Sequence, residues 1–327
     1  MTQPLVSVLI PTYKSFEGIY KTLNSIFSQT YSNIEIVIND DGSPNYGEYE
    51  SKIAKYIEEH KTPNISNVIF QHLEENVGTT QNCNSAIKVA KGKYLKAVPV
   101  DDELYDETVI SKCVEFCEKN QARILVGQTF VKRRTGEDTD KVRNTASYRW
   151  KARSGRMCNI TPTPKDIQYL KSLDTKTCNE LLMSRCIIST VAVFFSMELL
   201  RETNGFLEDF RLIEDMTYWP YLAKKGEKFF FSEIIMMKYA LNGVSNGGPL
   251  NSEFFRDYQI IMKEIYIKNE VRGGIFNPAL KRLRNRQIDW MRVSRENNSI
   301  GNKLKYLDVI CYQFWGNIKY LLAGTRL

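Results

Sequence analysis

The sequence predicts an α/β fold, in which a mainly parallel sheet is flanked by helices and followed by a helical C-terminal extension. Two observations lead to this prediction. Short runs of apolar, mostly β-branched residues alternate with segments of helical periodicity through residues 6–98. Several of these runs end directly in Pro, Asp or Gly residues, which are typical of strand ends. Alternation at this spacing is typical of βαβ units, whose strands run parallel.

The first four strands are expected at residues 6–10, 34–38, 67–70 and 93–98. Pro11 ends the first strand, because proline has no amide hydrogen to donate to a neighbouring strand. The helices between the strands are expected at residues 16–30, 49–60 and 80–90, where apolar residues recur at helical spacing. Gly92 follows the third helix and is typical of a helix C-terminus.

The rest of the chain is less regular and ends in helices. Further strands are expected at residues 123–130, 187–195 and 229–239. Residues 132–161 are polar, basic and rich in turn formers, so we expect a long loop of the kind that often serves as a lid. From residue 252 onward the apolar residues follow a helical period. The pattern predicts a first domain over residues 1–245 and a basic, helical region over residues 246–327.

Composition excludes several classes of protein. The chain has 327 residues, of which 43% are hydrophobic and 25% charged, so a disordered or low-complexity protein is excluded. No apolar run reaches the length of about 18 residues that a membrane span needs, and the N-terminus does not resemble a signal peptide. We therefore expect a cytoplasmic protein. Seven cysteines without a CxxC pair, and only two histidines, argue against a disulfide framework or structural zinc.

The net charge of +7 is concentrated in the C-terminal part of the chain. Residues 256–327 contain 14 Lys and Arg against six Asp and Glu, whereas the preceding residues are close to neutral. This asymmetry indicates an appended segment with its own partner, which is either an anionic surface or the acidic face of another protein.

Three expected strands end in polar residues, which a parallel sheet brings to one edge. These residues are Pro11-Thr12-Tyr13, Asp40-Asp41-Gly42 and Asp101-Asp102-Glu103, and ligands of open α/β sheets bind at this edge. The Asp-Gly sequence is also a common turn, and the later cluster could cap a helix, although Asp106 and Glu107 could do so instead. Adjacent carboxylates repel each other unless a cation neutralises them, and their oxygens suit Mg²⁺ or Mn²⁺.

No glycine-based nucleotide motif accompanies these acids. The sequence has no G-x-G-x-x-G after the first strand, no G-x-x-x-x-G-K-[ST] and no G-x-S-x-G. An acidic edge cannot hold a diphosphate through backbone dipoles alone. We therefore expect a divalent metal between the carboxylates and the phosphates of a ligand.

Several different short segments follow one another in a specific order along the chain. The first three are Val6-Ser-Val-Leu-Ile-Pro-Thr-Tyr13, Leu23-Asn-Ser-Ile-Phe-Ser-Gln-Thr-Tyr31 and Ile34-Glu-Ile-Val-Ile-Asn-Asp-Asp-Gly-Ser43. They are followed by Asn76-x-Gly78, Asn84-x-Ala86, Ala90-x-Gly92-x-Tyr94, Asp101-Asp102, Asn204-Gly205-Phe206, Glu214-Asp215 and Gly226. Together they closely resemble the family-2 glycosyltransferases over residues 5–242. That resemblance implies the GT-A fold and transfer of a sugar from a nucleoside diphosphate with inversion. Residues 1–112 would then hold the nucleotide-sugar and residues 113–245 the acceptor.

The resemblance also implies roles for the residues on the donor side. Asp41 would accept the imide N–H of uracil or thymine, or the N1–H of guanine. The ring of Tyr13 and the backbone of Pro11 and Thr12 would flank this base. Asp101 would lie near the ribose or the metal.

The metal ligands and the catalytic base follow from the same resemblance. Asp102, together with Asp101, would bind Mn²⁺ or Mg²⁺, which neutralises the departing nucleoside diphosphate. Asp215 would be the general base that takes the proton of the acceptor hydroxyl, and Glu214 is the second candidate. The alternative is that Glu214 and Asp215 only cap the helix that follows them.

The chain departs from the family pattern at four positions. Pro99 replaces the first Asp of a D-x-D-D element, and Cys83 stands where many members have Arg. Tyr221 also replaces an Arg, and Asn242 aligns with a His that helps to hold the metal or the diphosphate. These changes bear on donor affinity more than on the class of reaction.

We therefore predict an inverting, metal-dependent glycosyltransferase that takes part in the synthesis of a bacterial surface polysaccharide, such as a capsule, or of a glycoconjugate. Its expected partners are a UDP-sugar donor and a glycan or lipid-linked glycan acceptor, and no nucleic acid. One alternative is a sugar nucleotidyltransferase, which would need a Gly-rich loop where Pro11-Thr-Tyr-Lys-Ser stands. The other is a degenerate module that binds a nucleotide-sugar without turnover.

The last helical segment, residues 303–322, carries an apolar stripe preceded by basic residues at 281–286. The stripe consists of Leu304, Leu307, Ile310, Phe314, Ile318 and Leu321, with Trp315 and Tyr320 close to it. Apolar and basic residues in this arrangement favour contact with the cytoplasmic face of an anionic membrane. Packing on the first domain, or pairing of two chains as a homodimer, are the alternatives.

Overall fold

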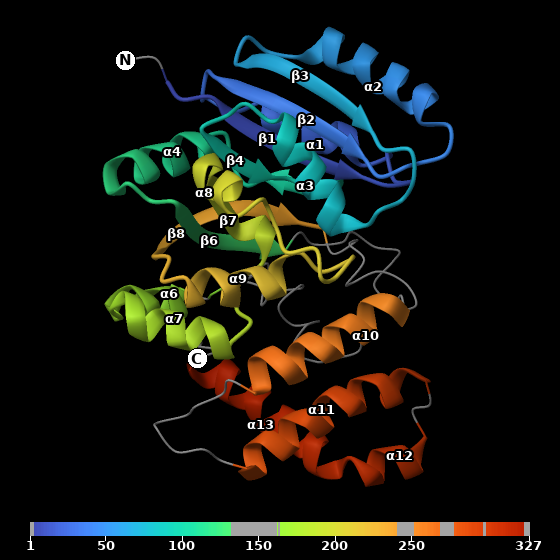
Figure 1. Cartoon of the computed structure of the whole chain (residues 1–327), viewed down its shortest axis with the longest axis vertical. Coiled ribbons are helices and arrows are strands. Elements are labelled where there is room, and N and C mark those ends of the chain that lie inside the picture. Colours follow the sequence, from blue (N-terminus) through green and yellow to red (C-terminus); the bar gives the residue numbers. More distant parts are fainter. Residues whose placement is uncertain are drawn as a thin grey trace.

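The computed structural model describes residues 3–131, 162, 164–240, 252–268, 278–296 and 299–323. Its centre is a sheet of eight strands in the order β3-β2-β1-β4-β7-β6-β8-β5 (Figure 1). The strands are β1 (Val6–Thr12), β2 (Ile34–Asp40), β3 (Ile65–His72), β4 (Tyr94–Ala97), β5 (Glu103–Leu104), β6 (Ile124–Val131), β7 (Val193–Ser196) and β8 (Phe229–Tyr239).

The first half of the sheet is parallel, as predicted. β1 pairs with β2 and with β4, and β2 pairs with β3, all in the parallel sense. The second half is mixed, because β7 runs antiparallel to both β4 and β6, and β5 runs antiparallel to β8. Only residues 193–195 of the strand predicted at 187–195 belong to β7, and a 3-10 turn, η1 (Thr190–Ala192), precedes it. An apolar run looks the same in either strand direction, so the pattern could not indicate this reversal.

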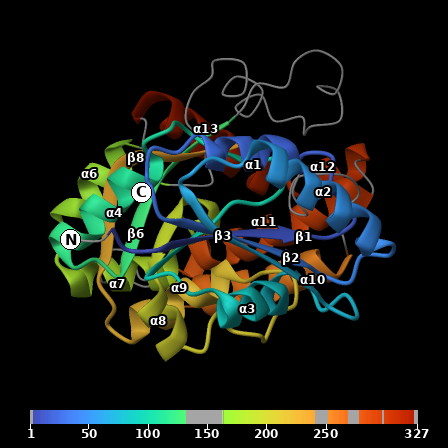
Figure 2. The same cartoon turned by 90° about the horizontal axis from the view of Figure 1, so that it is seen from above.

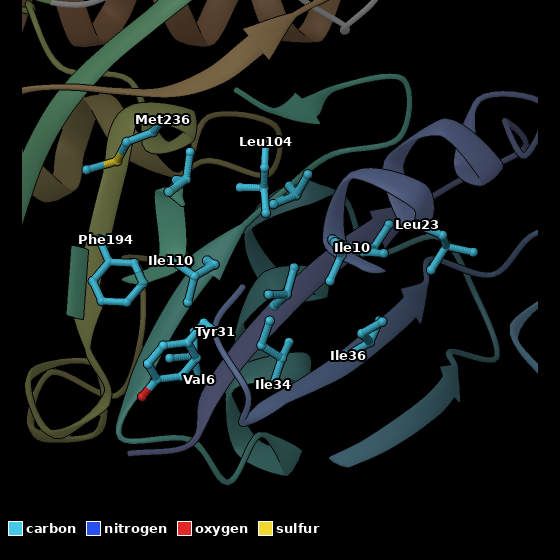
Figure 3. Close-up of a cluster of buried hydrophobic side chains, with 14 of the residues drawn as sticks. Val6, Ile10, Leu23, Tyr31, Ile34, Ile36, Leu104, Ile110, Phe194 and Met236 are labelled. Carbon is cyan, nitrogen blue, oxygen red and sulfur yellow. The ribbon is translucent and has the colours of Figure 1, made fainter. Parts of the chain in front are cut away.

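Helices cover both faces of the sheet, because alternate side chains of a strand point to opposite faces. Val8 and Ile10 pack with α1 (Ile19–Phe27), α2 (Tyr46–His60) and α4 (Val109–Asn120), in the apolar cluster of Figure 3. Leu9 and Val37 pack on the other face, in a second cluster. The helices of that face are α3 (Thr79–Val89), α6 (Pro164–Ser172), α7 (Thr175–Ser184), α8 (Met197–Glu202) and α9 (Asp215–Lys224). Figure 2 shows α1 and α2 on one side of the strands and α3 and α8 on the other.

The C-terminal region is helical, as predicted, and lies at the end of the molecule beyond α9 (Figure 1). It contains α10 (Ser252–Ile261), the π-helix η2 (Met262–Ile267), α11 (Pro278–Glu296), α12 (Ile300–Lys305) and α13 (Leu307–Ala323). The segment predicted as one helix over residues 303–322 is thus divided at Tyr306. No helix in the described part of the chain is long and apolar enough to cross a bilayer. The predicted boundary at residue 245, the predicted loop at 132–161 and Asn242 lie outside the described residues.

A lysine is buried at the centre of the sheet. The Lys96 side chain of β4 is fully buried, and its Nζ donates hydrogen bonds to the carbonyl oxygens of Val191 at 2.6 Å and Ala97 at 3.1 Å. Burial lowers the pKa of Lys96 from 10.5 to about 8, although Cys113 and Asp102 act in the opposite direction. Lys96 therefore fastens η1 to β4 at the cost of a poorly solvated ammonium group.

This burial predicts how stability depends on pH. Above a pH of about 8 the folded protein releases the Lys96 proton, while the unfolded chain keeps it up to a pH of about 10.5. The contribution of Lys96 to the free energy of unfolding therefore rises between these two pH values. We compare the free energy of unfolding of the wild type with that of Lys96→Met. Between pH 7 and pH 10, the wild-type value should rise by up to about 3 kcal/mol more than the value of the variant. Urea unfolding of both proteins at each pH measures this difference in free energy. Buried Cys and Tyr residues titrate in both proteins, so their contribution cancels from it.

Lys55→Met is the matched control, because Lys55 is well exposed on α2. It should keep the pH dependence of the wild type. Equal pH slopes for the wild type and Lys96→Met would contradict the prediction.

Candidate functional site

The carboxyl ends of β1, β2 and β4 meet at one edge of the sheet, as the sequence predicts. Thr12 lies opposite Asp40 in the register of β1 and β2, and the Asp41 amide donates to the Thr12 carbonyl oxygen at 2.9 Å. Thr12 is buried and Pro11 is half-buried, whereas the Tyr13 ring is exposed next to them. The polar residues after β1 and β2 therefore form one continuous surface.

Although the sequence pointed to a role only for its neighbour Asp41, Asp40 is the strongest structural anchor of this edge. Its buried carboxylate accepts hydrogen bonds from the Thr12 hydroxyl at 2.9 Å and from the Ser43 amide and hydroxyl, both at 2.7 Å. His72 Nδ1 lies 2.8 Å from the same carboxylate, and the His72 ring stacks on Tyr46. The only available signal was the position of Asp40 at the end of a buried strand. Asp40 thus ties the ends of β1, β2 and β3 together.

Asp41, predicted to read a nucleobase, holds the loop that leads into α3. Its Oδ1 accepts from the Val77 amide at 2.8 Å, and its Oδ2 accepts from the Gly78 amide at 2.9 Å and from Asn76 Nδ2 at 2.8 Å. Burial raises the pKa of Asp41, and the Val77 and Gly78 amides oppose that change. A carboxylate oxygen can accept two hydrogen bonds, so Oδ1 keeps one position for a further donor.

Asp101 follows β4 and lies against the start of α1. A methyl group added to Gly18, which precedes α1, would lie 1.8 Å from Asp101 Oδ1. Asp101 itself has a φ of +76°, which is uncommon outside glycine. Its carboxylate is therefore held near the positive end of the α1 helix dipole, where negative charge is stabilised.

Asp102 connects β4 to the far end of β8. Its side chain is buried, and Oδ1 accepts a hydrogen bond from the Ala240 amide at 2.8 Å. Its carbonyl oxygen accepts from the Thr22 hydroxyl at 2.8 Å. Burial raises the pKa of Asp102 to about 7, although the Ala240 hydrogen bond and the charge of Lys96 lower it. A buried carboxylate in this state would gain from a nearby cation.

The residues after β4 offer two metal ligands, Asp101 and Asp102. Within the described residues, no three His, Cys, Asp or Glu side chains lie together in a way that could hold a metal ion. Pro99, in place of a third acid, contributes only its carbonyl oxygen to this loop, where it accepts from the Asp102 amide. One or two carboxylates, completed by phosphate oxygens and water, are a usual set of ligands for Mg²⁺. The donor set therefore fits a metal that is shared with a bound diphosphate.

Glu214 and Asp215 stand at the start of α9, both half-buried. Burial raises the pKa of both carboxyl groups, and the charge of Glu214 raises that of Asp215 further. Glu214 occupies the N-cap position, but its side chain makes no capping hydrogen bond. The capping alternative is therefore not supported for Glu214. Cys83 of α3 is buried, which raises the pKa of its thiol, and the charges of Glu214 and Asp41 raise it further.

The two motif blocks of the sequence are in direct contact. Asn84 Oδ1 accepts from the Phe206 amide at 2.8 Å, and Asn84 Nδ2 donates to the Phe206 carbonyl oxygen at 2.9 Å. A methyl group on Gly205 would lie 2.2 Å from Asn84 Oδ1, so only glycine allows this approach. Residues 204–206 and α3 are thereby fixed to each other, and with them the segment that leads to Glu214.

Arg211 is a site residue that the sequence did not reveal. Its guanidinium lies 3.0 Å from the Asn76 carbonyl oxygen, also contacts Asn76 Oδ1, and forms an ion pair with Glu253 of α10 at 3.1 Å. Its own carbonyl oxygen accepts from the Thr80 amide at 3.1 Å. Arg211 lowers the pKa of Asp41. It therefore brings positive charge to the loop beside Asp41, and a single Arg in an irregular segment gives no pattern by which to find it.

The remaining predicted positions lie apart from these acids or outside the described residues. Tyr221 of α9 packs against the apolar cluster of α7, α8 and α9. His60 is exposed at the end of α2 and stacks on Tyr56. Asn242 is not among the described residues.

The chain is similar to known proteins in sequence and in fold. The model of glycosyl transferase family 2 matches residues 7–172. The chain is 32% identical over 127 residues to the glycosyltransferase GlyG of Streptococcus pneumoniae, a match that covers 38% of this chain and 39% of GlyG. The match thus spans about two fifths of that relative's length.

Two solved structures are similar over most of the chain. The structure of Staphylococcus aureus TarS 1–349 in complex with UDP-GlcNAc gives a TM-score of 0.53 at 14% identity, covering 93% of this chain and 79% of that one. The mannosyltransferase PcManGT of Pyrobaculum calidifontis, in complex with GDP-Man and Mn²⁺, gives 0.53 at 15% identity, covering 97% and 71%. At this identity the likeness shows the fold, and it confirms the predicted GT-A architecture.

The contact between Gly18 and Asp101 predicts a specific loss of stability. Gly18 has a helical φ of −81°, so alanine fits the backbone there, and the clash falls mainly on the Asp101 carboxylate. We expect Gly18→Ala to lower the free energy of unfolding by about 1–3 kcal/mol, and Asp101→Ala to remove most of that cost. A double-mutant cycle by urea unfolding measures the coupling.

Gly47→Ala serves as the control, because nothing lies within 4 Å of its added methyl group. As an alanine inside α2 it should raise stability by up to about 1 kcal/mol. Equal effects of Gly18→Ala with and without Asp101 would show that the two residues do not interact.

Proposed function

We propose that this chain, which belongs to glycosyl transferase family 2, is an inverting glycosyltransferase that moves a sugar from a nucleoside diphosphate to a hydroxyl group. The observation that carries the proposal is the position of the acid pair Glu214 and Asp215. The segment that leads to this pair is attached to the donor side, because Arg211 holds Asn76, a partner of Asp41, and Phe206 is bound to Asn84 of α3. Asp41 lies at the edge of the sheet to which β4 delivers Asp101 and Asp102. An acceptor hydroxyl near the pair could lose its proton beside a donor held at this edge.

In this proposal the donor base lies at the ends of β1 and β2. The remaining acceptor position of Asp41 Oδ1 takes the base N–H, and the exposed ring of Tyr13 stacks on the base beside Pro11 and Thr12. We take the donor to be a UDP-sugar, since TarS, of the same fold, was solved with UDP-GlcNAc. Arg211 supports this arrangement by holding Asn76, a direct partner of the Asp41 carboxylate.

Asp101 and Asp102 are the proposed ligands of Mn²⁺ or Mg²⁺, which would neutralise charge on the departing nucleoside diphosphate. The structure of PcManGT holds Mn²⁺ together with GDP-Man. Asp102 suits this role because its Oδ1 is oriented by the Ala240 amide, which leaves the other oxygen to the ligand. Asp101 is oriented in turn by its contact with Gly18.

Asp215 is the proposed general base, and Glu214 the second candidate. A base works best when its pKa lies near the working pH, and burial together with the neighbouring Glu214 moves the pKa of Asp215 in that direction. The carboxylate of Asp215 would take the acceptor proton as the hydroxyl oxygen attacks C1 from the side opposite the diphosphate, which inverts the anomeric centre.

The acceptor in this proposal is a glycan or a lipid-linked glycan of a bacterial surface polysaccharide or glycoconjugate. Residues 1–112 serve the donor, residues 113–245 serve the acceptor, and residues 246–327 form an added region. GlyG and TarS, two similar proteins, are both bacterial. Transfer from a panel of nucleotide-sugars to lipid-linked or soluble glycan acceptors tests this assignment directly.

A second function is a module that binds a nucleotide-sugar without turnover. Pro99 in place of an acid favours it. Thermal stabilisation by nucleotide-sugars, with and without Mn²⁺, identifies the donor in either case. Donor hydrolysis or transfer then separates the two, because only the enzyme releases free sugar or product.

The general-base assignment predicts a loss of turnover in Asp215→Asn. We expect kcat to fall at least about 10²-fold with little change in donor affinity, since only proton removal is lost. The kcat of the wild type should rise with pH through the raised pKa of the Glu214–Asp215 pair, because the base must be deprotonated. The Asn variant should lack this limb of the pH profile.

Asp209→Asn is the control, because Asp209 is an exposed acid in the same segment. It should keep normal turnover. If Glu214→Gln loses the pH limb and Asp215→Asn does not, the base is Glu214.

The metal assignment predicts that Asp102→Asn loses metal-dependent donor binding but still folds. An asparagine oxygen can still accept from the Ala240 amide, so the connection of β4 to β8 is kept. Calorimetry of UDP binding should show an enhancement by Mn²⁺ in the wild type and none in Asp102→Asn. Glu107→Gln, at an exposed acid nearby, should behave as the wild type. An unchanged Mn²⁺ effect in Asp102→Asn would rule out Asp102 as a ligand.

A further inference from the structure

The outer face of α12 and α13 exposes a row of large apolar side chains. Ile300 is 77% exposed, Leu304 66%, Leu307 53%, Phe314 64% and Trp315 62%. These five residues, called the α12–α13 face below, follow one another at spacings of four, three, seven and one residues. Ile300 and Leu304 are four residues apart in α12, and Leu307 and Phe314 are seven apart in α13, so each pair lies on one side of its own helix.

The opposite side of α13, together with Tyr306 at the junction with α12, is already packed. Tyr306 and Val309 are buried against Trp290 of α11, with Leu283 and Ile310 at the edges of this cluster. Ile310, predicted to belong to the apolar stripe, thus packs toward α11. The α12–α13 face is therefore a second apolar surface, which is not buried against other described residues of this region.

The charge around this face is positive. Acids of the region are engaged in ion pairs: Asp308 lies 2.9 Å from Arg286, and Asp289 lies 3.0 Å from Lys263. Lys303 and Lys305 of α12 are exposed between the apolar residues of the stripe. With 14 Lys and Arg against six Asp and Glu over residues 256–327, the region keeps an excess of positive charge.

We propose that the α12–α13 face lies on the surface of an anionic lipid bilayer, with its apolar side chains among the lipid chains and Lys303 and Lys305 at the head groups. Three features favour lipid as the occupant over a second copy of the chain. An equally basic copy would be repelled, whereas anionic head groups attract the lysines. Tryptophan is favoured at the boundary of apolar and polar lipid regions, and lysine stems can lie along apolar surface while their ammonium groups stay in water.

The face is also connected to the acid pair of the site. α12 and α13 pack on α11, and α11 packs on η2. The Tyr266 hydroxyl of η2 donates to the Met216 carbonyl oxygen at 2.6 Å, one residue after Asp215. Figure 1 shows α10 between α9 and α11, with α13 beside α11 and α12 at the far end of the molecule. A chain held to the bilayer by this face therefore presents its acid pair at a defined height above the lipid. This last point rests on the proposed function, whereas lipid binding itself does not.

Co-sedimentation with vesicles tests the proposal, using the full chain without donor or acceptor. We expect at least about tenfold stronger binding to vesicles containing phosphatidylglycerol than to pure phosphatidylcholine, and weaker binding at high salt. Lys303→Gln and Lys305→Gln should each weaken binding by about fivefold. Replacing Leu304, Leu307 and Phe314 together by Gln should weaken it by about tenfold or more, with unchanged thermal stability because these side chains are exposed.

Two further variants complete the experiment. Tyr169→Gln removes an exposed aromatic ring from α6, outside the face, and should bind as the wild type. Trp315→Phe should still bind but should lose the blue shift of tryptophan fluorescence that vesicles induce in the wild type. Because no sugar substrate is present, failure of the transfer reaction leaves this result unaffected.

The proposal is overturned if the wild type stays in the supernatant with anionic vesicles at low salt. It is equally overturned if the triple Gln variant binds as the wild type. Sedimentation that instead shows a dimer, abolished by the triple Gln variant while vesicle binding is absent, would assign the face to a second copy of the chain.

Discussion

Two adjacent carboxylates buried at the end of β2 set the arrangement of the whole site. Asp40 and Asp41 are both almost inaccessible to water, and a buried charge is tolerated only when hydrogen-bond donors surround it. Asp40 draws its donors from the ends of β1 and β3 and from the turn that follows β2. Asp41 draws its donors from the loop before α3. The requirement to satisfy both groups therefore fixes three strand ends and one helix start at a single point.

The same requirement extends to the second half of the chain. Asn76, a partner of Asp41, is held by Arg211, and Asn84 of α3 is bound to Phe206. Both contacts lie in the segment that ends at Glu214 and Asp215. On the other side of β4, Lys96 holds Val191 of η1, whose neighbour Thr190 adjoins the acid pair. The pair is thus positioned from two directions by polar contacts with the parallel half of the sheet.

The C-terminal helices divide into an inner and an outer layer with different physical characters. α10 and η2 share an apolar cluster with Ile213 and Met216, which flank the acid pair. Tyr306 and α13 share another with α11, while α12 and α13 leave apolar side chains exposed. The inner layer thereby stabilises the start of α9, and the outer layer presents charge and apolar surface to a partner. α11 packs on η2 and on α13, and so connects the two layers.

The sequence by itself determined the alternating strands and helices, the helical C-terminal region, and the convergence of Asp41, Asp101 and Asp102, because periodicity and strand ends are local properties. It could not indicate the direction of β7, since an apolar run is the same in both directions. Nor could it indicate that Arg211 reaches Asn76, or that Lys96 is buried, because such contacts join residues far apart in the chain. Which apolar residues of α12 and α13 are buried was likewise decided by tertiary packing, since a helical period shows that a face exists but not what covers it.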